Sequence, residues 1–308
     1  MPTLYLLFCV LGFLPQSVYA EDNPIVYIQT NYGTISVELA PEKAPVTVQN
    51  FLTYVNEGFY EDTLFHRVIA GFMIQGGGFT KAMQQKPTHV PIKLESNNRL
   101  KNSRGTIAMA RTSVADSATA QFFINSADNG FLNYQNTNNP GYAVFGKVIE
   151  GLEVVDLISK VSTSTAPATK DVPLQPVIIE AARVREAQLN FKDLKPIYSA
   201  GDTLTIALQE TTLKRKRALD LWVAVRLPGG ELRFISPENT DSFSVHAKPF
   251  KRKVSVSEAQ HAITSLLVPA GLAGQFAVFA IFNEPEHELN DLKHSLRSNL
   301  ASALLEIR

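Results

Sequence analysis

The stretch that decides the fold is residues 65–78, which read FHRVIAGFMIQGGG. Side chains alternate between the two faces of a β-strand, so Met73 and Gln75 share one face while Ile74 points to the other. An apolar side chain and an amide therefore stand together on a face that a soluble antiparallel sheet usually turns to water.

Residues 120–125, AQFFIN, repeat this arrangement, with Gln121 and Phe123 on one face of a second expected strand. Apolar side chains outside the core often mark a binding groove. Strands buried on both faces would give the same pattern, and the alternation by itself does not separate the two interpretations.

The sequence around these strands predicts a compact β-rich domain with two helices. Ile35, Val37 and Leu39 alternate with polar residues after an Asn-Tyr-Gly turn, which is typical of a hairpin. Pro45 is well suited to the first turn of a helix. One expected helix begins at Pro45, and a second covers residues 154–158. The expected strands are 25–29, 34–39, 63–69, 72–75, 105–110, 121–125, 144–149 and 177–184.

Four segments resemble, in order and spacing, the cyclophilin family of peptidyl-prolyl cis-trans isomerases. The resemblance extends from Ile25 to about Glu186, roughly half of the chain, and implies an eight-stranded antiparallel barrel capped by two helices. The segments are FHRVIAGFMIQGGGFT (65–80), RGTIAMAR (104–111), ATAQFFIN (118–125) and GYAVFGKV (141–148).

The resemblance also implies the site. Arg67 matches the catalytic arginine of the family, and Gln75 matches the amide that positions it. The side chains that match the pocket for the proline ring are Phe72, Met73, Phe123 and Leu132, and those that match the groove for the preceding residues are Ala110, Arg111 and Gln121.

Three residues depart from the pattern common in the family. Ala70 stands where a proline is common, Phe131 where many members have tryptophan, and Tyr142 where they have histidine. Phe131 and Tyr142 resemble the bacterial secreted branch and remain expected substrate contacts. They put high-affinity cyclosporin binding in doubt and leave the expected chemistry unchanged.

Other candidates for chemistry are weaker. The run Gly76–Gly78 could cradle a phosphate, but no Lys-Ser or Lys-Thr follows at the required spacing. His66 could act as a base, although it alternates away from Arg67 and is expected to be structural. The six histidines form no ligand pair, and there is one cysteine, so we expect neither a metal site nor a cofactor.

The N-terminal segment and the charge balance of the chain bear on its location and partners. An apolar run at residues 4–14, followed by Val18-Tyr19-Ala20, predicts a signal peptide over residues 1–20 with cleavage after Ala20, and hence a periplasmic or secreted protein without a transmembrane segment. Cys9, the only cysteine, would leave with it. Lys and Arg (29) balance Asp and Glu (29), so nucleic acid is not an expected partner.

The alternation of apolar and polar residues becomes irregular over residues 187–196, which we interpret as a linker between two domains. Residues 197–308 predict a β-sandwich domain of unknown role. Runs of alternating apolar and polar residues, such as 221–227, are followed by a Pro-Gly-Gly turn and a further strand, which is typical of a hairpin. Trp222 is expected in its core. The basic run 214–217 is expected to be a solvated turn.

Two functional hypotheses follow. The first is a prolyl isomerase that acts on proline-containing polypeptides, namely unfolded or partly folded envelope proteins. The alternative is a proline-peptide-binding or adhesive module with vestigial isomerase activity. The presence of Arg67 together with the pocket residues favours the first, because a pure binding module would not need the donor.

Overall fold

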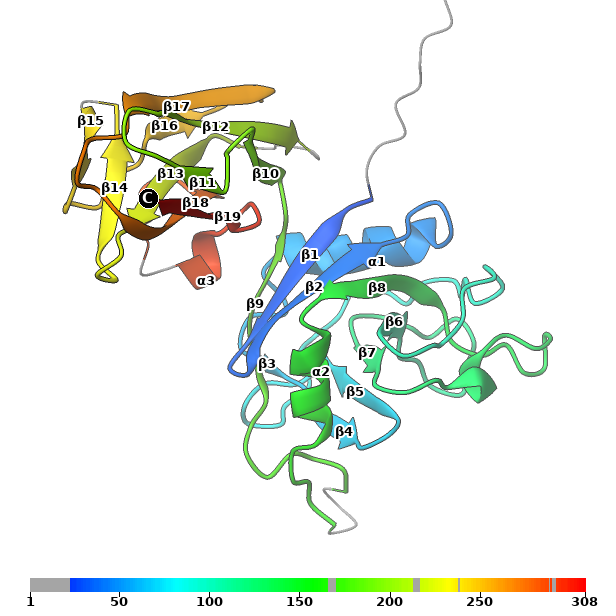
Figure 1. Cartoon of the computed structure of the whole chain (residues 1–308). Helices are drawn as coiled ribbons and strands as arrows, with labels where there is room; N and C mark the ends of the chain where they lie inside the picture. The colour runs from blue at the N-terminus through cyan, green and yellow to red at the C-terminus, as the bar shows by residue number, and fades with distance from the viewer. Residues whose placement is uncertain (1–22, 166–169, 213–216, 238, 288, 290–291) are drawn as a thin grey trace, which may run out of the picture.

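The computed structural model describes residues 23–165, 170–212, 217–237, 239–287, 289 and 292–308. Figure 1 shows two β-rich domains side by side. No helix among the described residues is long and apolar enough to cross a membrane. The expected signal peptide lies outside the described residues.

One antiparallel sheet forms the first domain, with the strand order β3-β9-β1-β2-β8-β6-β7-β5-β4. The predicted hairpin is confirmed, with Ile28 opposite Ile35. The strands are β1 (Ile25–Thr30), β2 (Gly33–Leu39), β3 (Thr63–Leu64), β4 (Arg67–Ile69), β5 (Met73–Gly76), β6 (Thr106–Met109), β7 (Phe122–Asn125), β8 (Val144–Glu150) and β9 (Ile178–Val184).

The sheet has nine strands because the single strand expected over residues 63–69 is divided in two. Phe65 and His66 separate β3 from β4, and these two strands are the opposite edges of the sheet. The edges therefore meet, and Leu64 N donates to Phe79 O (2.9 Å) across the seam. A Cβ on Gly76 would lie 2.8 Å from Leu64 O, so the glycine run allows this close approach and needs no phosphate to explain it.

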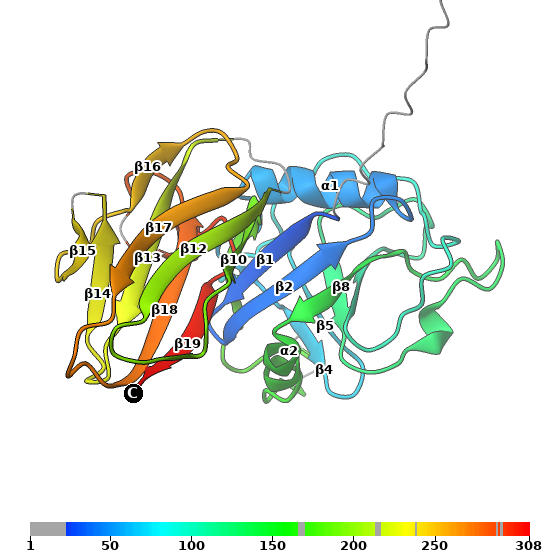
Figure 2. The same cartoon turned by 45° about the horizontal axis from the view of Figure 1, so that its top comes forward.

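Two helices cover opposite ends of the barrel, α1 (Pro45–Asn56) and α2 (Leu152–Ser159) (Figure 2). Pro45 occupies the first turn of α1, as predicted, and Val48, Phe51 and Val55 are buried against the barrel interior. A short 3₁₀ helix, η1 (Gly130–Leu132), lies on the opposite side of the sheet from this core.

The second domain is a sandwich of two sheets, as expected. Leu189 and Leu208 of the smaller sheet share a core with Val223 and Val278 of the larger one. The smaller sheet contains β10 (Ala187–Lys192), β12 (Thr203–Thr212) and β17 (Gln260–Leu267). The larger contains β11 (Ile197–Tyr198), β13 (Leu219–Arg226), β14 (Leu232–Ser236), β15 (Asn239–Ser244), β16 (Lys251–Val254), β18 (Gly274–Asn283) and β19 (Ala301–Ile307), and α3 (Leu292–Ser295) precedes β19.

The linker predicted over residues 187–196 is wrong for its first six residues, which form β10 and belong to the sandwich. Ala187 and Leu189 are fully buried, and Asn299 binds both the amide and the carbonyl of Leu189 through its side chain. Polar residues between the apolar ones concealed this strand in the sequence. Arg185 N donates to Ile25 O in the first domain and Glu186 N to Arg297 O in the second, so the connection is one hydrogen-bonded extended segment.

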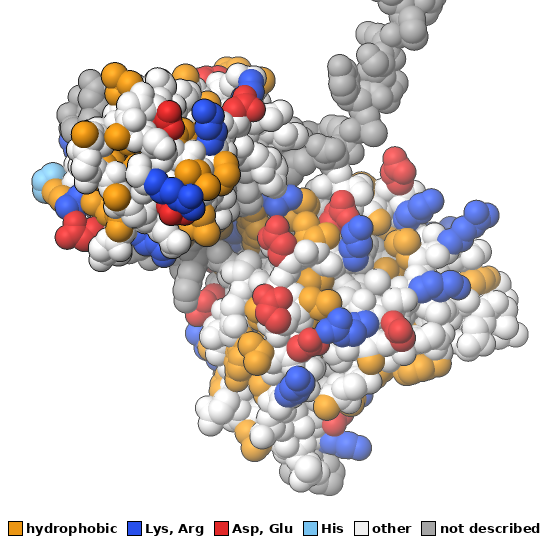
Figure 3. Space-filling model, in the orientation of Figure 1, with side chains coloured by type: hydrophobic (Ala, Val, Ile, Leu, Met, Phe, Trp, Pro, Cys, Tyr) orange, Lys and Arg blue, Asp and Glu red, His pale blue; other side chains and the backbone are white. Residues whose placement is uncertain are grey.

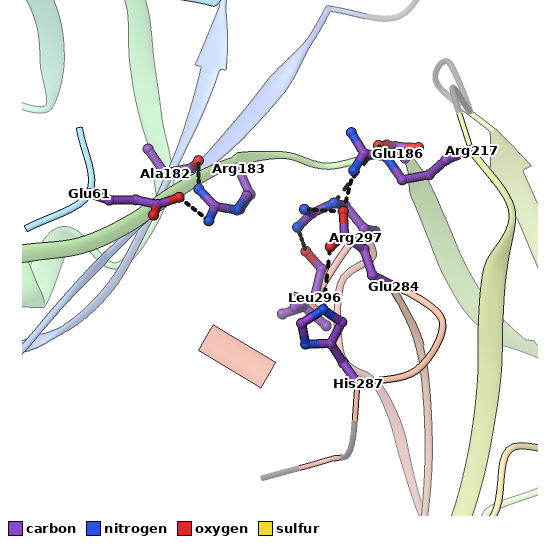
Figure 4. Close-up of polar contacts among 9 residues, drawn as sticks. All are labelled: Glu61, Ala182, Arg183, Glu186, Arg217, Glu284, His287, Leu296 and Arg297. Atoms are coloured by element: carbon purple, nitrogen blue, oxygen red, sulfur yellow. Dashed lines mark hydrogen bonds and ion pairs between the residues drawn. The ribbon is translucent and has the colours of Figure 1, made fainter. Parts of the chain in front are cut away.

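A cluster of ion pairs lies at this junction (Figure 4). Arg297 Nη2 lies 2.6 Å from Glu284 Oε1, and Arg217 contacts Glu284 and lies 3.2 Å from Glu186 Oε1. Arg217 of the basic run is solvated, as predicted, since its side chain is 47% exposed, and it forms these ion pairs in addition. Residues 214–216 lie outside the described residues. Arg183 pairs directly with Glu61 within the first domain, and both side chains line a cavity of about 300 Å³ at the junction.

Charges of both signs are interspersed over the first domain on the face shown in Figure 3. This distribution agrees with the balanced composition, because no extended field of one sign covers this face.

Candidate active site

An apolar cluster separate from the barrel core lies on the outer face of four neighbouring strands, β5, β7, β6 and β8 (Figure 1). Phe123 is the centre of this cluster, because it pairs with Gln75 on one side and Ala108 on the other. The cluster consists of buried Met73, Ala108, Phe123 and Val144 with partly buried Ile69, Phe72, Leu100, Ala110, Leu132 and Tyr142.

The alternation predicted from the sequence separates the two clusters. Ile74, Phe122 and Ile124 point into the barrel core, whereas Met73 and Phe123 belong to the outer cluster. The outer cluster is therefore a second apolar cluster, separate from the barrel core. Strand β7 is nevertheless buried on both faces, as the other interpretation of the sequence pattern predicts.

Arg67 and Gln75 lie directly opposite each other on β4 and β5 at the edge of this surface. The Arg67 side chain is 43% exposed, so its guanidinium can reach a bound peptide. Gln75 Nε2 donates to Gln121 Oε1 (3.0 Å), which brings the two predicted amides together. Because this contact of Gln75 is to Gln121, its role in positioning Arg67 stays a prediction.

Asp171 contacts Arg67 and was not found from the sequence. Its Oδ2 lies 3.5 Å from Arg67 Nε, and its backbone carbonyl accepts a hydrogen bond from Val68 N (2.8 Å). Asp171 has a positive φ of 67° and its amide donates to Ser164 O, so the loop fixes it in a conformation that few residues with a Cβ adopt. A carboxylate held in this way can orient the guanidinium.

Asp171→Asn is expected to lower kcat for a proline tetrapeptide about two- to fivefold, the scale of a partly exposed ion pair. KM should change little, because Asp171 lies outside the apolar cluster. Steady-state kinetics of the wild type, Asp171→Asn and Asp171→Glu test this, with Asp171→Glu retaining the charge. A loss confined to KM, or none at all, would show that Asp171 does not position Arg67.

Two of the three departures from the family pattern, Phe131 and Tyr142, lie in the wall of the groove. Phe131 is 64% exposed and stacks on Phe72, with ring centroids 5.6 Å apart. Tyr142 meets Phe123 edge to face, and the Arg111 guanidinium lies 4.6 Å from the Tyr142 ring centroid. The structure thus places all four aromatic side chains and Arg111 at one surface.

Three buried asparagines support this wall, and the sequence reasoning missed them. Asn129 Nδ2 donates to Phe72 O (2.8 Å) and to Asn125 Oδ1 (2.7 Å), while Asn102 Nδ2 donates to Leu132 O (3.1 Å). They connect β5, β7 and η1 through satisfied amides, which rigidifies a polar network in a buried region. Polar residues within apolar segments were the only signal available in the sequence.

Gln121 lies against the backbone of the glycine run. A Cβ on Gly78 would be 2.5 Å from Gln121 Cγ, so only glycine leaves room for this side chain. Ala110 N donates to Gln121 O (3.0 Å), which joins two of the predicted groove residues. All predicted site residues are therefore placed on one side of the sheet.

His66 is buried beside Phe79, with ring centroids 4.5 Å apart. Burial lowers its pKa to about 4, and the nearby charge of Arg67 acts in the same direction. A neutral, buried imidazole agrees with a structural role. Among the described residues, no three His, Cys, Asp or Glu side chains are grouped so that they could hold a metal ion.

The low pKa of His66 predicts loss of stability in acid. An unfolded chain takes up this proton near pH 6.5, whereas the folded protein takes it up only near pH 4. This contribution is therefore complete above about pH 6.5 and decreases as the pH falls towards 4. Urea unfolding at pH 7 and pH 4.5 should show a smaller pH effect in His66→Gln than in the wild type; equal effects would contradict the assignment.

Comparisons with known proteins agree with this geometry. The sequence model of the family described as "Cyclophilin type peptidyl-prolyl cis-trans isomerase/CLD" matches residues 25–184, slightly more than half of the chain. The chain therefore belongs to the cyclophilin-type peptidyl-prolyl cis-trans isomerases and is an enzyme of this class.

Individual relatives cover the first domain. The chain is 54% identical over 176 residues to a peptidyl-prolyl cis-trans isomerase of Acinetobacter baylyi, covering 57% of this chain and 93% of that protein. It is 54% identical over 164 residues to peptidyl-prolyl cis-trans isomerase B of Escherichia coli, covering 53% of this chain and all of that protein. A crystal structure of a cyclophilin-type isomerase from Cryptosporidium parvum covers 53% of this chain and 97% of its own, at 28% identity and a TM-score of 0.44.

Proposed function

We propose that this isomerase acts on unfolded or partly folded proteins of the cell envelope, in the periplasm or outside the cell. The observation that carries the catalytic part is the apolar surface around Phe123 beside the exposed guanidinium of Arg67. The location rests on the apolar run at residues 4–14 and the small residues that follow it.

The reaction requires rotation about a bond and no bond cleavage. The barrier of about 18–20 kcal/mol arises because rotation breaks amide resonance. The cis and trans forms of an X-Pro bond differ by only about 0.5–1 kcal/mol. The enzyme therefore has to stabilise the twisted amide, and neither a nucleophile nor a general base is needed.

Arg67 can supply this stabilisation. In the twisted state the proline nitrogen regains its lone pair and accepts a hydrogen bond, which it cannot do when the amide is planar. A guanidinium beside the bound proline thus binds the transition state more strongly than the ground state.

The apolar surface can hold the proline ring while the carbonyl that precedes it rotates. Met73 and Phe123 form its buried floor, and Phe72 and Leu132 lie at its sides. Gln121, which accepts a hydrogen bond from Gln75, and Arg111, which lies over the Tyr142 ring, would contact the residues before proline, as the family resemblance implies. Anchoring one side of the bond and donating to its nitrogen is sufficient for the proposed mechanism.

Two measurements on the natural host test this proposal. Cell fractionation and N-terminal sequencing should find the chain outside the cytoplasm and beginning at Glu21. Its absence should slow the folding of envelope proteins whose folding is limited by proline isomerisation. A cytoplasmic chain that still begins with Met1 would overturn the location, and unchanged envelope folding would overturn the substrate class.

A further inference from the structure

The outer face of the larger sheet in the second domain is apolar where a sandwich usually turns polar side chains to water. Trp222 and Ala224 of β13 lie beside Ile281 of β18 and Phe234 of β14, outside the sandwich core. Trp222 is nevertheless buried, and its indole Nε1 donates to Asn283 Oδ1 (2.7 Å). Trp222 is thus a buried core residue, as expected, but it belongs to a smaller apolar cluster and not to the cluster that fills the space between the two sheets.

This face is hollowed into a groove of about 340 Å³. Leu232 is 43% exposed and Leu300 is 58% exposed at its margins, so the apolar surface is open to solvent. The lining residues are Trp222, Ala224, Leu232, Phe234, Phe279, Ala280, Ile281, Leu289, Leu292 and Leu300, with no charged side chain among them.

The chemistry of the lining restricts what can occupy the groove. A small-molecule site carries a few polar groups that orient the ligand, and a folded partner brings a polar rim with hydrogen bonds. The described lining residues offer apolar side chains and aromatic faces, which favour apolar side chains in the occupant. The chain is also neutral overall, so it exerts no long-range preference for charged partners.

The enzyme's own substrate provides such side chains. A chain segment whose X-Pro bond is free to rotate is not packed in a folded structure, and its apolar side chains are then exposed. Folded proteins seldom expose contiguous apolar segments. The occupant that matches both the groove and the activity is therefore an unfolded polypeptide.

We propose that the groove around Trp222, Leu232 and Leu300 is a second docking site that holds apolar segments of the polypeptide whose proline bonds the first domain isomerises. This inference rests on the proposed function for its substrate class. It assigns a role to the second domain, which the relatives that match residues 25–184 do not account for.

The junction between the domains suits such a role. Only Arg185 and Glu186 separate β9 from β10, and both are hydrogen-bonded through their backbone amides. Helix α3, which contributes Leu292 to the groove, lies next to β9 of the first domain. The two sites are thus joined through a short hydrogen-bonded connection, and a chain bound at one site has a raised effective concentration at the other.

The test compares full-length wild type with the double variant Leu232→Asp/Leu300→Asp. Both leucines are exposed, so folding should be retained, and circular dichroism checks this. Leu267→Asp is the matched control, because Leu267 is an exposed leucine (68%) on β17 of the other sheet. The probe is reduced and carboxymethylated α-lactalbumin, a permanently unfolded chain, with binding followed by fluorescence anisotropy.

The double variant should bind the probe at least about tenfold more weakly than wild type, the effect of introducing two charges into an apolar site. Its kcat/KM for a proline tetrapeptide should be unchanged, because a tetrapeptide is too short to engage both sites. Leu267→Asp should bind the probe as wild type does. Arg67→Ala should show the reverse behaviour, with normal probe binding and slow isomerisation.

Unchanged probe binding in the double variant would overturn the docking site. A concentration-dependent wild-type dimer that the double variant abolishes, with probe binding unaffected, would assign the groove to a second copy of this chain and overturn it also. Failure of the proposed envelope role is distinguishable, since it would leave these binding results in place while changing the location or the natural substrates.

Discussion

Arg67→Ala is expected to reduce kcat/KM for a proline tetrapeptide about 10²- to 10³-fold, the scale of removing one preorganised donor, or about 2.7–4 kcal/mol. The guanidinium is the charged donor at the edge of the apolar surface around Phe123. Folding should be retained, because the Arg67 side chain is partly exposed and lies outside the barrel core. A protease-coupled isomerisation assay on the folded variant measures the effect.

Arg104→Ala is the control for this variant. Arg104 is also a partly exposed arginine of the first domain, and it pairs with Asp156, away from the groove. Its kcat/KM should stay near that of the wild type. Near-wild-type activity in the folded Arg67→Ala variant would contradict the proposed mechanism.

Arg297→Ala is expected to have the largest effect on stability, a loss of about 3 kcal/mol in the free energy of unfolding. Arg297 and Glu186 are almost fully buried, and Glu284 is largely so. Removing one partner from a buried ion pair costs about 3–5 kcal/mol, because the remaining charge stays in a poorly solvated place. The contacts of Arg217 with both carboxylates put the expected value at the lower end (Figure 4).

Urea unfolding measures this loss, and Arg104→Ala again provides a comparison, since a partly exposed pair contributes at most about 1 kcal/mol. The Arg297→Ala transition should shift most in signals from the second domain, for which Trp222 fluorescence is a natural probe. A shift no larger than that of Arg104→Ala would contradict the account of the junction as a buried ionic network.

The sequence predicted those parts of the fold in which local pattern and burial agree. Alternation over residues 34–39 gave the hairpin, and Pro45 gave the start of α1, because each depends on neighbouring residues. The interruption at Phe65 and His66 could not be predicted, since it results from closure of the barrel between two edges. Strand β10 was not predicted, because polar residues alternate with its buried apolar side chains Ala187 and Leu189.

The site, like the fold, could be predicted from the sequence only in part. Alternation placed Met73 and Phe123 on an apolar face away from the core, and the structure confirms this arrangement. The role of Asp171 could not be predicted from the sequence, because its contact with Arg67 joins a strand to a loop about a hundred residues away in the chain. The outer face of β13 in the second domain shows the same signal, but Trp222 in an alternating strand is ordinarily a core residue.

The central claim is that Arg67 accelerates rotation of a bound X-Pro bond without contributing much to its binding. Nuclear magnetic resonance exchange measurements on a proline peptide can separate the dissociation constant from the rate of cis-trans exchange on the enzyme. The account predicts a similar dissociation constant for the wild type and Arg67→Ala, and an exchange rate about 10²- to 10³-fold lower in the variant. An unchanged exchange rate, with the loss appearing only as weaker binding, would contradict it.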